Sequence, residues 1–215
     1  MGRRNRQTGQ TPGNADTHFP GFDVLSQAEH WDVETRRVVL DRTKPPGPLR
    51  FFTDAEARAA AALFDQLLDQ RSEPRVPVLQ MVDSRLAEHQ TDGWHYDDMP
   101  IDDVAWQRSL AALDDEAQTS RGRCFAECEW DDQSRIVAGV QDAGSADWHG
   151  LRADRLWSLW TRYASTAFYS HPWAWNEIGF SGPAYPRGYK NARIGGREPW
   201  EVKEQRPVDP VWSPS

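Results

Sequence analysis

Apolar side chains along this chain recur every three or four residues, which is the spacing of one face of an α-helix. The clearest such series consists of Ala60, Leu63, Phe64, Leu67 and Leu68. It follows the sequence T-D-A-E, in which Thr53 and Glu56 can bind each other's backbone N–H groups as a capping box. The pattern therefore predicts a helix that begins after Thr53 and buries one face.

Similar series predict five more helices. They cover about 33–43 with Asp32 as its cap, about 78–90, a segment that starts at Asp102 and Asp103 and is broken by Gly122, about 131–142, and the most apolar run, from Leu156 to Phe168, which Pro172 ends. No run alternates as β-strands do, and no segment of about 20–50 residues repeats. The predicted fold class is mostly α, a single-domain bundle of about six helices with an ordered, irregular C-terminal tail rich in Pro, Gly and Trp.

Polarity and proline content set the expected boundaries of that domain. Residues 1–20 carry few apolar side chains, which predicts a disordered N-terminal tail. The helical domain is expected over 21–190. Seven of the 15 prolines lie from Pro172 onward, so 191–215 is expected to be an extended tail rather than another helix.

The stretch Pro172–Tyr189, with the sequence PWAWNEIGFSGPAYPRGY, concentrates aromatic side chains among glycines and prolines. Because Gly favours turns and Pro lacks an N–H donor, this composition argues against a regular helix and for an ordered irregular segment. One interpretation is a loop that folds over the chain's own core. The other is a docking surface for a second protein, because Trp, Tyr and Arg are the preferred anchors of protein interfaces.

The charge balance excludes some classes of function. The chain has 33 acidic and 25 basic residues, a net charge of −8 and no basic block, so neither nucleic acid nor an anionic membrane surface is an expected partner. No apolar run approaches the roughly 18 residues of a membrane-spanning helix. The 11 Trp residues indicate an aromatic core or an aromatic interface.

Residues with catalytic or metal-binding chemistry are scattered. The closest histidines are His89 and His95, and no nucleotide-binding, hydrolase or zinc-protease motif is present. The acidic residues that suggest calcium are Asp97, Asp98, Asp102 and Asp103. They lack the alternating positions and central Gly of a calcium loop, and helix capping explains the last two more simply. We therefore predict no catalytic, cofactor-binding or metal-binding residue in this chain.

The two cysteines, Cys124 and Cys128, have neither zinc-site nor haem-attachment spacing. The simplest interpretation is one buried thiol that packs as a small apolar side chain. A redox pair or an intermolecular disulfide is the alternative.

Three segments resemble the subunit 3 (small subunit) family of gluconate 2-dehydrogenase. They are FFTDAEARAAAALFDQLL at 51–68, FAECEWDDQSRIVAGV at 125–140, and FYSHPWAWNEIGFSGPAYPRGY at 168–189. The last segment is the most specific, because it matches the family pattern W-x-x-x-G-[FY]-x-G-P at Trp175, Gly179, Phe180, Gly182 and Pro183. The likeness covers about 51–190.

The resemblance implies a non-catalytic accessory subunit without a cofactor of its own. Such subunits accompany a large FAD-binding flavoprotein of the glucose–methanol–choline type, which oxidises sugars or other alcohols, and in many complexes a cytochrome c subunit takes the electrons. The small subunit is then a folding, maturation or export companion. The expected anchors for the flavoprotein are Trp173, Trp175, Phe180, Pro183, Tyr185 and Arg187.

Two other functions and the cellular location remain open at this point. Acidic residues such as Asp97, Asp98 and Glu177 could serve a free-standing acid–base enzyme, and Trp173 and Trp175 could be stacking platforms of a carbohydrate-binding module. Arg3 and Arg4 resemble the start of a twin-arginine export signal, but polar residues follow where an apolar region is needed. A cytoplasmic location is therefore expected, with a periplasmic one only if a signal-bearing partner exports the chain.

Overall fold

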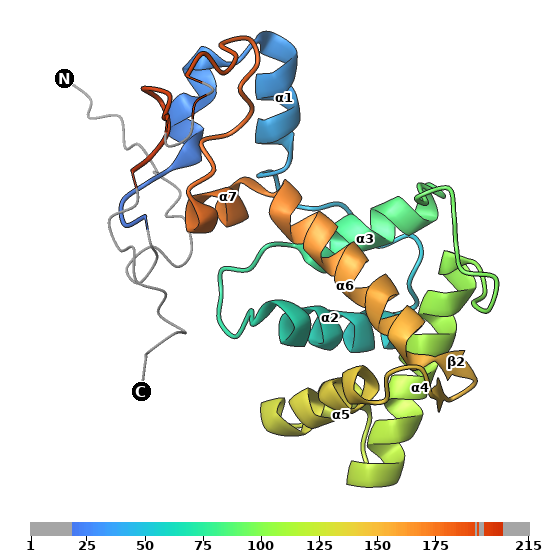
Figure 1. Cartoon of the computed structure of the whole chain (residues 1–215). Helices are drawn as coiled ribbons and strands as arrows, with labels where there is room; N and C mark the ends of the chain where they lie inside the picture. The colour runs from blue at the N-terminus through green and yellow to red at the C-terminus, as the bar shows by residue number, and fades with distance from the viewer. Residues whose placement is uncertain (1–18, 192, 194–195, 204–215) are drawn as a thin grey trace. The chain divides into compact units, whose positions relative to one another are not determined.

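The structure is a computed structural model that describes residues 19–191, 193 and 196–203 (Figure 1). Its α-helices are α1 (Val33–Asp41), α2 (Asp54–Leu68), α3 (Val78–Ala87), α4 (Asp102–Arg121), α5 (Trp130–Asp142), α6 (Ala153–Ser170) and α7 (Pro172–Ile178). Two 3-10 helices, η1 (Val24–His30) and η2 (Phe125–Glu127), complete the helical part. The predicted mostly α fold class is therefore confirmed.

The structure departs from the predicted elements at four places. The segment 172–178 is a helix, α7, rather than irregular chain, whereas the rest of Pro172–Tyr189 is irregular as predicted. Two-residue strands, β1 (Asp147–Trp148) and β2 (Leu151–Arg152), form an antiparallel hairpin. The sequence did not predict it, because a strand of two residues is too short to show an alternation of apolar and polar side chains. The 3-10 helices η1 and η2 were also not predicted.

The packing of the described chain forms two compact units. Unit 1 contains the described residues of Met1–Lys44 and Tyr169–Ser215, and unit 2 is Pro45–Phe168. The expected boundaries at residues 20 and 190 stay predictions. Most of the predicted N-terminal tail, including Arg3 and Arg4, and much of the predicted C-terminal tail lie outside the described residues.

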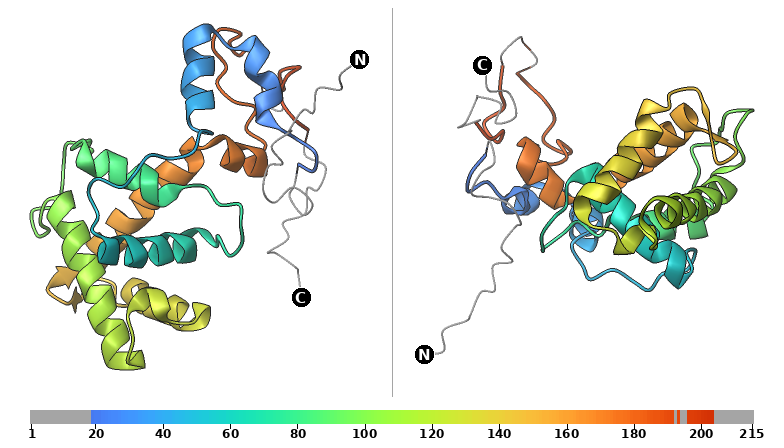
Figure 2. Two further views of the ribbon diagram at one scale, coloured as in Figure 1. Left: turned by 180° about the vertical axis from the view of Figure 1, so that it is seen from behind. Right: turned by 90° about the horizontal axis from the view of Figure 1, so that it is seen from below.

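In unit 2, α2 contacts α3, α4, α5 and η2, so it lies among the other helices (Figure 2). The core beside it is aromatic. The Trp106 ring is 5.4 Å from that of Phe64, 5.7 Å from that of Tyr163 and 6.2 Å from that of Phe52, measured between centroids. Part of the high Trp content therefore serves this core.

Two sets of hydrogen bonds fix the start of α2. The predicted capping box is present, with the Thr53 hydroxyl accepting the Glu56 N–H and the Glu56 carboxylate accepting the Thr53 N–H at 2.9 Å. Just before it, the fully buried Asp83 of α3 accepts three backbone N–H groups, from Arg50, Phe51 and Phe52, at 2.7–2.9 Å. A buried carboxylate is tolerated here because these donors replace its hydration.

Unit 1 is built from the two ends of the described chain. Its core consists of Val24, Trp31, Val39 and Trp175, which come from η1, its C-terminal cap, α1 and α7. The Val24 N–H donates to the Asn176 side chain at 2.7 Å, which ties η1 to α7 across 152 positions of sequence. In Figure 1 the C-terminal segment runs beside η1 and α1.

Candidate partner-binding surface

Helix α7 carries the first two predicted anchors, and its ends explain why it forms. The buried His171 is the N-cap, and its Nδ1 accepts the Trp173 N–H at 3.2 Å. Pro172 occupies the first helical position, where a missing N–H costs nothing. Gly179 ends the helix in the left-handed conformation, with φ of 68°.

The predicted anchors Trp173 and Trp175 lie in different environments. Trp175 is 5% exposed, and its indole N–H donates to the Tyr169 carbonyl at 2.6 Å. Trp173 is half-buried, with its ring 4.9 Å from that of His171 between centroids. Trp175 is therefore a core residue of unit 1, and only Trp173 keeps surface that another molecule can reach.

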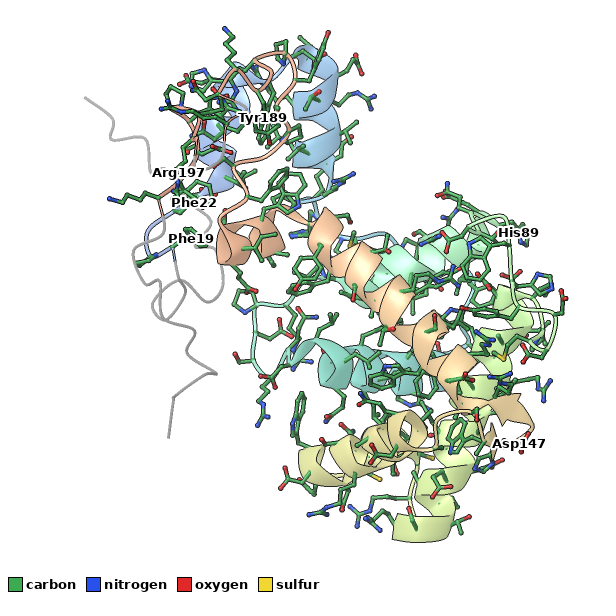
Figure 3. All side chains as sticks on the ribbon, viewed as in Figure 1. Phe19, Phe22, His89, Asp147, Tyr189 and Arg197 are labelled. Carbon is green, nitrogen blue, oxygen red and sulfur yellow. The ribbon has the colours of Figure 1, made fainter. Side chains whose placement is uncertain are left out.

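The two glycines of the W-x-x-x-G-[FY]-x-G-P pattern also serve the packing of unit 1. A Cβ at Gly179 would lie 2.3 Å from the Phe19 ring, which Figure 3 shows beside α7. A Cβ at Gly182 would lie 2.5 Å from the Trp31 ring and 3.2 Å from a Val24 methyl group. The pattern thus closes the C-terminal segment onto the N-terminal part of this unit.

We expect Gly182→Ala to lower the free energy of unfolding by about 2 kcal/mol or more, because overpacking adds to the cost of a positive φ. Gly188→Ala is the matched control, since Gly188 has a similar φ of 69° with no atom within 4 Å of a Cβ. Urea unfolding of both variants measures the difference. Equal losses would show that packing against Trp31 contributes nothing.

The remaining predicted anchors differ in exposure. Tyr185 is 65% exposed and Phe180 is 37% exposed, with the Phe180 ring edge-on to Trp175. Pro183 is half-buried. Arg187 binds within its own unit, since its Nη1 donates to Gln27 at 3.0 Å and its guanidinium lies 4.1 Å from the Trp200 ring centroid.

Unit 1 also exposes apolar residues other than the predicted anchors Phe180 and Tyr185. Of the 11 large apolar side chains found exposed in the described chain, eight belong to unit 1. They are Val33, Val38, Leu40, Tyr169, Ile178, Phe180, Tyr185 and Tyr189. On α1 the only signal was that apolar residues follow one another at 38–40, so that one helical face cannot bury them all. A concentration of exposed apolar side chains in one part of a protein is typical of protein-binding regions.

In unit 2, arginines of α6 pack on aromatic side chains of the loop before α4. The Arg155 guanidinium lies 3.7 Å from the Tyr96 ring centroid, and that of Arg162 lies 5.0 Å from Trp94. Arg162 also pairs with Asp92. Trp94 is 49% exposed, and with Ile101 and Val104 it makes up the three exposed large apolar residues of unit 2.

The acidic residues considered for calcium or catalysis do not form one group. Three of them pair with other side chains, and one lies in the other unit. Asp102 accepts a hydrogen bond from the Tyr163 hydroxyl at 2.6 Å, Asp103 pairs with His89 at 3.2 Å, and Asp98 pairs with Arg152 at 2.8 Å. Asp97 belongs to the same loop of unit 2, whereas Glu177 is an exposed residue of α7 in unit 1. Among the residues that the structure describes, no three His, Cys, Asp or Glu side chains form a group that could hold a metal ion.

The cysteines flank η2. Cys124 is exposed and Cys128 is buried, and both are free thiols in the described chain. Burial raises the pKa of the Cys128 thiol, which makes it less reactive. The prediction that one of the two thiols is buried is confirmed for Cys128.

None of the described helices is both long enough and apolar enough to cross a bilayer.

Comparison with known proteins identifies one family. No curated protein and no solved structure matches the chain significantly. The family model described as gluconate 2-dehydrogenase subunit 3 matches residues 54–182, which is more than half of the chain and includes Trp175, Gly179 and Gly182. The chain belongs to the gluconate 2-dehydrogenase subunit 3 family.

Proposed function

We propose that this protein is the non-catalytic accessory subunit of an FAD-dependent sugar or alcohol dehydrogenase of the glucose–methanol–choline type. The observation that carries the proposal is the family match over residues 54–182. In this role the chain binds and stabilises the flavoprotein subunit during folding or maturation. FAD belongs to the flavoprotein, and a cytochrome c subunit is a further candidate member of the complex.

The proposed binding surface for the flavoprotein lies on unit 1. It carries eight of the 11 exposed large apolar side chains and the accessible parts of Trp173, Phe180 and Tyr185. Aromatic side chains at a protein boundary bury a large area while their polar tips still form hydrogen bonds. The cytoplasm is the proposed location, with export only in a complex whose partner carries the signal.

We expect Trp173→Ala to weaken binding to the flavoprotein by about 2 kcal/mol or more, which is roughly 30-fold, because a half-buried Trp is a typical interface anchor. Affinity is measured with the purified flavoprotein from the complex that contains this chain, by surface plasmon resonance. Trp94→Ala is the control, since it removes an exposed Trp from unit 2.

Two outcomes would contradict the proposal at different levels. If the wild-type chain neither co-purifies with the flavoprotein nor binds it, the accessory-subunit function is wrong, and the acid–base enzyme and the carbohydrate-binding module become the better hypotheses. If the wild type binds and Trp173→Ala binds equally well, only the assignment of Trp173 to the interface is wrong.

A further inference from the structure

An open groove in unit 1 adjoins the proposed binding surface and has a chemical character of its own. It has a volume of about 290 Å³. Its lining includes the aromatic residues Phe19, Phe180, Tyr189 and Trp200 and the charged residues Arg197 and Glu201. Tyr189 and Trp200 lie 5.4 Å apart between ring centroids. Phe19, Tyr189 and Arg197 can be followed in Figure 3. Because Phe180 belongs both to the groove and to the proposed surface, the two are continuous.

The segment that forms one wall of this groove is basic. Residues 187–203 contain five Lys or Arg and two Glu, which gives a net charge of +3 in a chain whose total is −8. Four of these five bases are exposed. They are Lys190, Arg193, Arg197 and Lys203.

Both acidic residues of the segment are engaged by its own backbone. Glu198 is 6% exposed and accepts the N–H groups of Lys190 and Asn191. Glu201 accepts the Glu198 N–H at 2.7 Å. In the described part of the chain, the four exposed bases have no acidic side chain within salt-bridge distance. The outward charge of this segment is therefore positive.

We propose that the groove receives an acidic segment of the flavoprotein, with an apolar side chain against Phe180 and Tyr189 and a carboxylate on Arg197. This inference rests on the proposed function and adds the chemistry of the partner's surface. An apolar side chain matches the aromatic lining. A carboxylate matches arginine because charge-assisted hydrogen bonds to guanidinium are strong and directional. The neighbouring Lys190 and Arg193 add attraction during the approach of an acidic surface.

The test measures binding of the purified flavoprotein at low and at physiological salt. We expect Arg197→Glu to weaken binding roughly tenfold or more at low salt and to reduce the salt dependence, since like charges then oppose each other. Arg58→Glu is the matched control, because Arg58 is an exposed arginine of α2 in unit 2, and its reversal should leave the affinity within about twofold.

A second variant separates charge from local structure. Arg197 also donates to the Val202 carbonyl at 2.8 Å, so its replacement can loosen the turn it belongs to. The double variant Lys190→Glu, Arg193→Glu leaves that bond in place and should weaken binding and reduce its salt dependence in the same way.

Three results would overturn the inference. The first is wild-type affinity in both variants while the wild type binds the flavoprotein, which would leave the proposed function standing. The second is a lower unfolding temperature of the isolated double variant with unchanged affinity, which would make another segment of this chain the occupant. The third is a loss of self-association in sedimentation with unchanged flavoprotein binding, which would make a second copy the occupant.

Discussion

Trp175→Ala is expected to lower the free energy of unfolding of unit 1 by about 3–5 kcal/mol, the usual cost of truncating a buried Trp. Trp175 packs with Val24, Trp31 and Val39 in the core of this unit. The substitution also removes the indole N–H that binds the Tyr169 carbonyl at 2.6 Å. Since unit 1 has a small core, little surrounding structure is left to fill the cavity.

Amide hydrogen exchange measures this loss in each unit separately. The Val24 N–H, which is bonded to Asn176, reports on unit 1, and the Phe52 N–H, which is bonded to Asp83, reports on unit 2. We expect exchange at Val24 to become roughly 10²–10⁴-fold faster in Trp175→Ala and exchange at Phe52 to change much less. Trp173→Ala is the control and should have a small effect. Equal effects of the two substitutions would contradict the assignment of Trp175 to the core and Trp173 to the surface.

The long helices were predictable because their signals are local. The Thr53–Glu56 capping box and the apolar series after it lie within 16 residues, and helix α2 begins and ends within one residue of the predicted segment. Asp32 caps α1 and Gly122 ends α4 as predicted. Such signals act through hydrogen bonds between near neighbours, so the sequence contains all the partners.

The short elements were missed for a different reason. Helices of fewer than about 12 residues are marginal in isolation and depend on tertiary packing. The 3-10 helix η1 is fixed by the Val24–Asn176 hydrogen bond, whose partners are 152 positions apart. For α7 a local signal did exist, since Pro172 at the first position and Gly179 at the end are typical helix boundaries. Pro172 was interpreted only as the end of the preceding helix.

The composition of the candidate surface was predictable, but the exposure of its residues was not. The sequence concentrated aromatics in Pro172–Tyr189 and made both Trp173 and Trp175 candidate anchors. Because 172–178 is helical, the two side chains differ by two positions of a helix, which places them on different faces. Which of them is buried depends on Trp31 and Val39, which are more than 130 positions away in sequence. Arg187 likewise binds Gln27, 160 positions away.

The second large effect is expected from pH, through the buried His171. Desolvation by burial lowers the pKa of His171 from 6.5 to about 4, the hydrogen bond to the Arg42 backbone opposes this shift, and the positive charge of Arg42 adds to it. Because the unfolded chain binds the proton more tightly, this group contributes stability that is complete above about pH 6.5 and is lost as the pH falls to about 4. The full contribution is about 3 kcal/mol, of which roughly 2 kcal/mol is lost by pH 5.

Asp65 in unit 2 contributes with the opposite sign. Burial raises the pKa of Asp65 from 3.8 to about 6 against the pull of Arg75, so the folded chain binds this proton more tightly. Its contribution to stability is present at low pH and is lost as the pH rises from about 3.8 to 6. The unfolding curve of the wild type alone can therefore show little pH dependence in this range, and the test has to compare variants.

His171→Asn isolates the histidine, because Asn is a favoured N-cap whose side-chain oxygen can accept the Trp173 N–H without titrating. We expect the stability lost between about pH 7.5 and pH 5 to be roughly 2 kcal/mol smaller in this variant than in the wild type, as measured by urea unfolding at both values. Asp65→Asn should change the same difference in the opposite direction. If the free energy of unfolding changes equally with pH in the wild type and in His171→Asn, the imidazole is protonated at little cost in the folded chain. That result would contradict its role as the neutral cap of α7.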